Sequence, residues 1–110
     1  MAKPPAEMLK GTLDLLVLRT LELQPLHGIA VADRIHQVTG GTFEIGPGSL
    51  FPALHRLERE GWVRGEWRTS EEGRRTRAYT LTAAGRRQLA AEKKHWARIV
   101  AAVGQVLDSA

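Results

Sequence analysis

The 110-residue chain has no cysteine, and this absence excludes disulfide bonds, zinc–thiolate centres and thiol catalysis. Long apolar runs are absent too. Arg19 and Glu22 interrupt the most apolar stretch, Leu13 to Leu23, before it reaches the roughly 18 residues that a membrane span needs. The first five residues show no apolar segment of the signal-peptide type. We therefore expect a cytoplasmic protein that has no membrane partner.

Groups that carry out catalysis are equally scarce. The chain has only three aspartates, Asp14, Asp33 and Asp108, and its histidines do not follow the spacing of a metal site. No glycine-rich segment continues into the lysine and hydroxyl residue of a phosphate loop, and no nucleophile elbow is present. These absences argue against an enzyme, and we expect no cofactor and no bound metal.

The residues that are present fit one globular domain, since 43% are apolar and 25% are charged. Residues 1–73 carry 8 basic and 10 acidic side chains, whereas residues 74–98 carry 8 basic side chains and one acidic side chain. A positive region of this kind favours a polyanionic partner such as nucleic acid. On charge alone, a solvated basic helix face explains the region equally well.

Apolar residues at helical spacing fill the first half of the chain, and an alternating pattern follows them. The expected elements are helices at residues 9–23, 28–39 and 49–60, strands at 62–68 and 75–81 joined by a polar tip at 69–74, and a last helix at 83–107. The first helix is apolar on nearly every side, so other elements must cover it on several sides. In so small a chain, this pattern favours a partner chain.

The last helix spans roughly 37 Å, which is longer than a domain of this size can cover. Its apolar residues recur at heptad-like spacing, broken once by Glu92, and such a stripe packs against another helix. We therefore expect a homodimer. The expected interface residues are Leu13, Leu16, Leu89, Trp96, Ile99, Val100, Val103, Val106 and Leu107.

Three helices followed by a hairpin with arginines at its tip is the order of a winged helix-turn-helix. We expect a mainly α fold with a two-stranded β-wing: a flexible leader at residues 1–8, a winged-helix DNA-binding domain at 9–82 and a dimerisation helix at 83–110. The third helix can lie in the major groove of double-stranded DNA, while the hairpin reaches a phosphate or the minor groove. Two such units on a dimer read half-sites about one helical turn apart.

Several segments in the right order resemble the PadR family of transcriptional regulators. They are Met8–Asp14, Leu26–Gly28, Gly48–Glu58, Glu60–Gly61, and Gly73–Arg75 followed by Tyr79–Thr82. The resemblance covers residues 8–107, and the single long helix at the end is similar to the smaller PadR subgroup. It implies a cytoplasmic homodimer that binds operator DNA and represses transcription, with recognition helix, wing and dimerisation helix as placed above.

The chain departs from the family pattern at two positions. Phe51 stands where the family commonly has tyrosine, so a hydroxyl that can bond to a phosphate is missing. Ala78 replaces the first of two aromatic residues before the Leu-Thr pair, which we interpret as a change in packing.

The residues expected to contact DNA lie on the third helix and the wing. They are Ser49, Phe51, Pro52, His55, Arg56, Arg59, Arg74, Arg75 and Arg77. A serine at a helix start is also an ordinary cap, and the helix arginines have glutamates nearby that offer ion pairs instead. Arginines at a hairpin tip have no core to serve and suit phosphates and narrow minor grooves. The basic residues of the last helix are interpreted as a solvated face.

Trp96, on the expected dimer stripe, has two interpretations. It is either a large anchor in the dimer core or one wall of a pocket for a small aromatic or apolar effector. The PadR resemblance allows the second, because some members bind planar compounds. The candidate pocket residues are Trp96, Ile99, Leu13, Leu16, Val17 and Glu92. The alternative function for the whole chain is a protein-interaction module that uses the winged-helix surface on an acidic partner and does not bind DNA.

Overall fold

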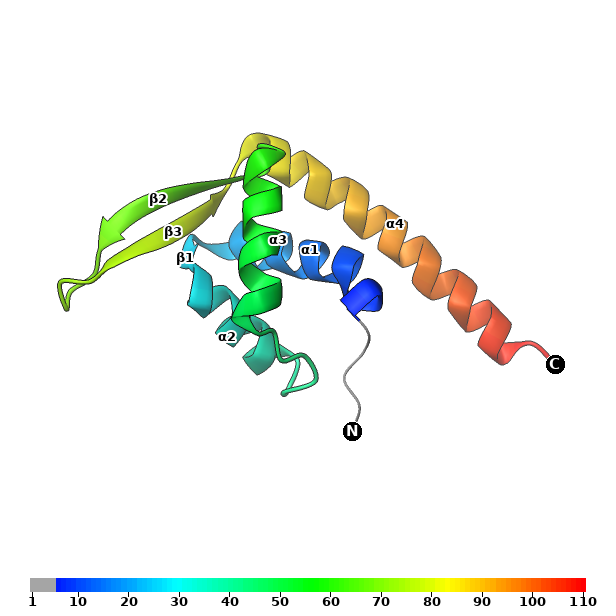
Figure 1. The fold of residues 1–110 in the computed structure, drawn as a ribbon. Coiled ribbons are helices and arrows are strands. Elements are labelled where there is room, and N and C mark those ends of the chain that lie inside the picture. The colour runs from blue at the N-terminus through cyan, green and yellow to red at the C-terminus, as the bar shows by residue number, and fades with distance from the viewer. Residues whose placement is uncertain (1–5) are drawn as a thin grey trace.

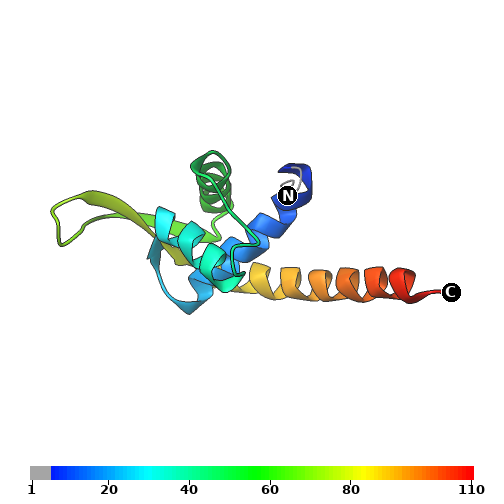
Figure 2. The ribbon, with the colours of Figure 1, turned by 90° about the horizontal axis from the view of Figure 1, so that it is seen from below.

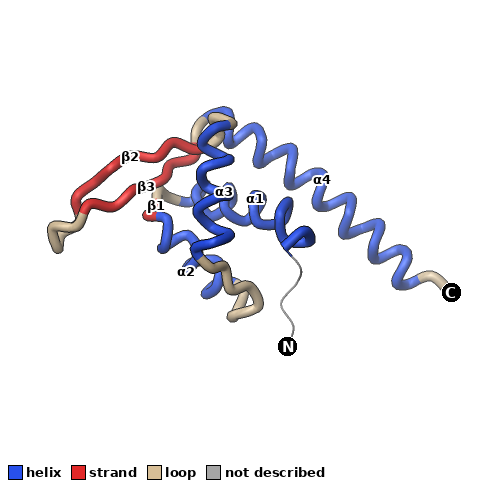
Figure 3. The backbone as a smooth tube through the Cα atoms, in the orientation of Figure 1, coloured by secondary structure: helices blue, strands red, loops and turns tan. Residues whose placement is uncertain are grey.

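The computed structural model describes the backbone from residue 6 and the side chains from residue 11, up to residue 110. The described chain is mainly helical, with one small antiparallel sheet (Figure 1, Figure 3). Its elements are α1 (Ala6–Leu23), β1 (Leu26–His27), α2 (Gly28–Val38), α3 (Pro47–Arg59), β2 (Val63–Thr69), β3 (Arg75–Leu81) and α4 (Ala83–Asp108). This order confirms the predicted winged-helix fold with a long last helix.

Two helices begin earlier than expected, and the sheet has one more strand than expected. α1 begins at Ala6, so residues 6–8, expected in a flexible leader, are helical; residues 1–5 lie outside the described part. α3 begins at Pro47 with Gly46 as its N-cap, because proline has the backbone angle of a first helical position and needs no partner for an N–H there. The short strand β1 was not expected, since two residues are too few to show alternation. It adds a third strand beside β3.

α1 lies at the centre of the helical body, where α2, α3, α4 and β3 all contact it. Four of its side chains are at most 7% exposed: Leu13, Val17, Leu18 and Leu21. Around them lie Val31, Ala32, Ile35, Leu50, Ala53, Leu54, Leu57, Val63, Tyr79, Leu81 and Leu89. Most of the described apolar side chains of α1 are therefore buried or partly buried by their own chain, so the apolarity of this helix does not by itself require a partner chain.

β2 and β3 form the wing, a hairpin that extends away from the helical body (Figure 1). In their register Gly65 lies opposite Tyr79, and Trp67 lies opposite Arg77. Because residues two apart on a strand share a face, these four residues lie on one face of the wing. Gly73 closes the tip with a backbone φ of +81°, a conformation that glycine adopts without strain.

α4 begins in the helical body and then leaves it. The Thr82 hydroxyl accepts a hydrogen bond from the Gly85 N–H at 3.0 Å and donates one to the Gly61 carbonyl at 2.7 Å. Gly85 and Leu89 are buried, so the first turns of α4 share the core of the preceding domain. Leu89 is only 1% exposed, which corrects its expected place in a dimer interface. Beyond it, α4 and the wing project from opposite sides of the body (Figure 2) and give the molecule extents of 60 × 34 × 21 Å.

Candidate nucleic-acid interface

α3 has a buried side and an exposed side. Leu50, Ala53, Leu54 and Leu57 point into the core. Four of the residues expected at DNA are exposed: Ser49, Pro52, His55 and Arg59. In Figure 2, α3 is seen nearly along its axis at the edge of the body, away from α4. The exposed side of α3 therefore has the access that an α-helix needs to enter a major groove.

Two residues at the start of α3 have local roles besides their exposure. Ser49 is not the helix cap, because its backbone N–H donates to the Gly46 carbonyl at 3.1 Å from within the first turn. Phe51 is half-buried, and its ring lies so close to Gly28 of α2 that a Cβ there would be 2.9 Å from the Phe51 ring carbon Cε1. The aromatic ring thus packs α3 against α2, a role that phenylalanine fills as well as tyrosine.

Arg56, expected on the DNA-facing side, has an internal partner. Its Nη2 donates to Asp14 Oδ1 of α1, and the two side chains are only 29% and 22% exposed. The pair ties α3 to α1. Sequence alone could not reveal it, because the partners are 42 residues apart.

Arg77 of β3, expected at DNA as a wing residue, is also held within the chain. Its Nη2 donates to Glu58 Oε2 of α3 at 2.5 Å, and its guanidinium lies over the rings of Trp67 and Tyr79. Burial raises the pKa of Tyr79, and the nearby Arg77 charge opposes that rise. Arg77 therefore joins the wing to α3.

The wing tip carries the more accessible cations. Arg74 and Arg75 are exposed, and neither forms an ion pair within the described part of the chain. Three hydrogen bonds hold the tip. The Arg74 N–H donates to Ser70 Oγ at 3.1 Å, the Ser70 N–H donates to the Arg74 carbonyl at 2.7 Å, and the Gly73 N–H donates to the Ser70 carbonyl at 3.0 Å. The Arg75 guanidinium lies 5.4 Å from the centre of the Trp67 ring. A fixed backbone and two guanidinium groups that form no ion pair within the described residues suit contact with phosphates.

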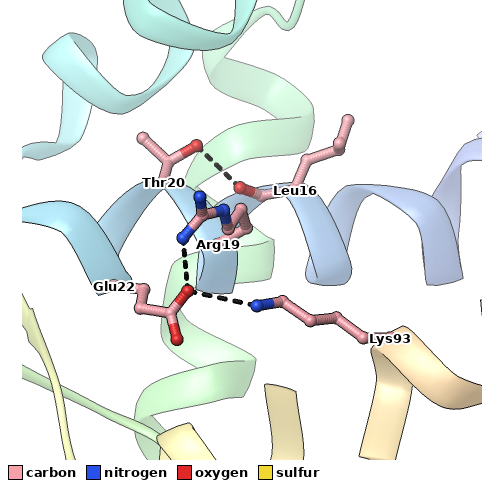
Figure 4. A network of polar contacts seen from close by, with 5 residues as sticks. All are labelled: Leu16, Arg19, Thr20, Glu22 and Lys93. Atoms are coloured by element: carbon pink, nitrogen blue, oxygen red, sulfur yellow. Dashed lines mark hydrogen bonds and ion pairs between the residues drawn. The ribbon is translucent and has the colours of Figure 1, made fainter. Parts of the chain in front are cut away.

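The basic side chains of α4 are mostly exposed, as expected for a solvated face. One of them has a structural partner: Lys93 Nζ lies 3.3 Å from Glu22 Oε1 at the end of α1, and Arg19 Nη1 lies 2.5 Å from the same oxygen (Figure 4). The hydrogen bond from Arg19 contributes most to a lowered pKa of Glu22, with Lys93 adding to it. This network links α1 to α4.

The expected dimer and effector residues divide into two groups. Leu13 and Val17 lie in the core of their own chain, and Leu16 is half-buried against it, so Val17 in particular is not accessible to an effector. Glu92 is half-buried and accepts a hydrogen bond from Gln88 Nε2 at 2.8 Å. The remaining residues form an exposed apolar stripe on α4, between 38% and 77% exposed: Trp96, Ile99, Val100, Val103, Val106 and Leu107. A shallow apolar groove at the end of the stripe is lined by Ala102, Val103, Val106 and Leu107.

Within the described part of the chain, no three His, Asp or Glu side chains come together in a group that could hold a metal ion. None of the helices described is both long and apolar enough to cross a membrane.

Comparisons with known proteins agree with this geometry. The profile of the transcriptional regulator PadR-like family matches residues 17–91. An uncharacterized 37.1 kDa protein in a transposon of Streptomyces fradiae is 44% identical over 97 residues, which cover 88% of this chain but only 26% of that protein. Transcriptional regulator Rv3488 of Mycobacterium tuberculosis is 40% identical over 52 residues, 47% of this chain and 48% of that one. The crystal structure of a PadR-like transcriptional regulator from Bacillus cereus superposes with a TM-score of 0.80 at 27% identity and covers 94% of this chain and 99% of the other.

Proposed function

The chain belongs to the PadR-like family of transcriptional regulators, and from this premise we propose that it acts as a homodimer that binds a specific operator and represses transcription in the cytoplasm. One observation carries the proposal. His55 and Arg59 on the exposed side of α3, and Arg74 and Arg75 at the wing tip, form no ion pair within the described residues, whereas Arg56 and Arg77 do. Arginines without an internal ion pair, on a helix and an adjacent hairpin, suit a polyanion with a groove, and His55 adds a hydrogen-bonding group beside Arg59.

The exposed stripe on α4 supports the dimer. Six large apolar side chains along one side of a projecting helix are unusual on a monomer, and their heptad-like spacing suits a second copy of the same helix. A second copy of the same chain supplies this partner helix, so the proposed dimer needs no other protein. In such a dimer, the two copies of α3 read two half-sites related by the dimer axis.

The repressor role and its relief are further parts of the proposal. A dimer seated on operator DNA blocks access of polymerase to a promoter that overlaps it. An effector that is small, planar and apolar fits between two copies of α4, where Trp96 is 43% exposed and offers an aromatic face. Ile99 and Val103 lie on the same stripe and complete an apolar lining.

A fluorescence-anisotropy titration tests the proposed function. The duplex is the region upstream of the chain's own coding sequence, a scrambled duplex of equal composition is the control, and both are titrated at about 50 mM and about 200 mM salt. We expect tighter binding to the upstream duplex, with the gap persisting at the higher salt because base contacts do not depend on counterion release.

Two outcomes contradict the proposal. Equal and steeply salt-dependent binding to both duplexes reports only the basic field of the protein and argues against operator recognition at this region. No binding to either duplex at any salt favours the protein-interaction module.

A further inference from the structure

The guanidinium of Arg77 is enclosed on several sides by its own chain. Its Nη2 bonds to Glu58 Oε2 at 2.5 Å, and its central carbon lies 5.8 Å from the Trp67 ring centre and 5.9 Å from that of Tyr79. Gly65 forms the floor, because a Cβ there would lie 2.4 Å from Arg77 Nε. Nε itself is buried without a hydrogen-bond partner. We call these four neighbours, with Arg77, the Arg77 anchor.

The wing register explains why the anchor forms. Trp67 faces Arg77 and Gly65 faces Tyr79 across the strand pair, so all four lie on the face of the wing that turns toward α3. A side chain at position 65 would displace the guanidinium, so glycine here makes room for it. A planar cation between aromatic rings and a carboxylate combines cation–π attraction with a charge-assisted hydrogen bond.

Arg75 lies on the same face but differs in one respect. Its guanidinium also lies over the Trp67 ring, at 5.4 Å, yet it is exposed and has no carboxylate partner within the described chain. Glu58 neutralises the charge of Arg77, whereas the charge of Arg75 is available to an external anion. The stacked ring limits the positions that the Arg75 side chain can take.

We propose that Arg77 is a positioning residue that fixes the wing to the recognition helix through Glu58, and that Trp67 holds Arg75 in place to bind a DNA phosphate. The proposal rests on the proposed function for its DNA partner. Glu58 lies one turn from His55 and next to Arg59 on α3, so the anchor sets the wing at a constant distance from the side chains that face the groove. A wing held at that distance loses less conformational entropy when it binds.

Substitution of Glu58 gives the sharpest test of the anchor. A purely electrostatic role of Glu58 and a positioning role predict opposite changes in the affinity for DNA. The probe is the duplex that the wild-type chain retains most strongly from a random library. Removing a negative charge beside DNA strengthens binding if only charge matters. We expect E58A instead to weaken DNA binding by about five- to tenfold. E58Q loses less affinity, because its amide oxygen still accepts the hydrogen bond from Arg77. The double variant E58A/R77A binds no more weakly than R77A alone, because both substitutions break the same contact. E60A is the matched control: it removes a nearby exposed carboxylate that Arg77 does not touch and leaves binding equal or stronger.

The salt dependence separates the two arginines. R75A lowers the slope of log K against log salt by about one unit, because one phosphate contact is lost. R77A weakens binding with the slope unchanged. A slope that falls equally in R77A and R75A, or an E58A variant that binds more tightly than wild type, overturns the proposal.

A measurement without DNA keeps the anchor testable even if no duplex binds. In NMR spectra, we expect the Arg77 Nε–H signal to be separated from the other arginine signals by the ring currents and to exchange slowly with solvent. We expect W67L to reduce the ring-current shift and leave the part that Tyr79 contributes. An Arg77 signal that exchanges as fast as those of exposed arginines overturns the anchor. Thermal unfolding of each variant shows that it is folded.

Discussion

His55 and Arg59 are the basic residues of α3 whose side chains are exposed and form no ion pair within the described chain. Imidazole and guanidinium groups on a helix in the major groove bond to base edges, guanine above all. We predict that H55A and R59A change which base is preferred at one position of each half-site, at a cost of about 1–3 kcal/mol on the preferred duplex. Competition between duplexes with single-base changes measures this preference.

R56A is the control for that experiment. Because Arg56 pairs with Asp14, its loss lowers the free energy of unfolding and leaves the base preference as it was. A change of base preference in R56A, with none in H55A or R59A, contradicts the assignment of roles on α3.

Arg74 and Arg75 lead to a different prediction, since phosphates carry no direct sequence information. The R74A/R75A variant binds every duplex more weakly by a similar factor, and its salt slope falls by about two units. The matched control is K94A, a cation exposed on α4, which leaves the slope unchanged. A selective loss on one sequence shows instead that the wing reads bases.

Glu22 gives a pH dependence with a defined sign. Its folded pKa lies below the ordinary value of 4.5, so the stabilisation is fully present above pH 4.5 and is lost as the pH falls through the folded pKa. Because the site is at the surface, the contribution is less than about 1 kcal/mol. Urea unfolding of wild type and E22Q from neutral to acid pH measures it, and the gap between the two curves closes on the acid side. A gap that widens as the pH falls contradicts the sign.

The sequence identified the exposed residues of α3 and the wing tip better than the paired ones. Helical spacing shows which side of α3 is polar, but it does not show that Arg56 meets Asp14 on another helix. The spacing along α3 suggests its glutamates as partners for the arginines of the same helix, whereas Glu58 binds Arg77 of β3. Contacts between distant segments depend on packing, which a single sequence does not display.

The junction between the wing and α4 is packed closely around Gly85. A Cβ on Gly85 would lie 2.0 Å from the Trp62 carbonyl oxygen, a backbone atom that can move only if the wing moves. We predict that G85A lowers the free energy of unfolding by about 1–3 kcal/mol. Urea denaturation measures this difference.

Gly104, farther along the same helix, is the matched control. Within the described residues, a Cβ at this position would have no atom within 4 Å besides the adjacent backbone of its own helix. We therefore expect G104A to stabilise the helix by about 0.5–1 kcal/mol. Equal effects of the two substitutions contradict the close packing of α4 on Trp62.

At the scale of elements, the periodicity of apolar residues predicts where the helices and the hairpin lie. It does not predict which other elements cover their apolar sides. α1 is apolar on nearly all sides because four elements of its own chain cover it. The heptad-like pattern of α4 begins at Leu89, yet this residue belongs to the monomer core, and only the part from Trp96 onward is exposed. A repeat specifies which residues share a side of a helix but not what covers them.

At the scale of the whole molecule, the projecting part of α4 carries the exposed apolar stripe through which we propose that the chain dimerises. We predict that V103D dissociates the proposed dimer, because it places a charge in the middle of the apolar stripe that the proposal buries between two chains. A101D carries the same charge on the opposite side of the helix and leaves the dimer intact. Sedimentation velocity measures the mass of each variant, and a monomeric wild type contradicts the prediction.

Selection of duplexes from a random library by the wild-type chain, at about 150 mM salt, tests the central claim most directly. A dimer with one α3 and one wing in each half predicts an enriched inverted repeat whose half-sites are about one helical turn apart, and binding that is lost when about five base pairs are inserted between them. Enrichment of no sequence, or of a single unrepeated motif that tolerates the insertion, would contradict the account.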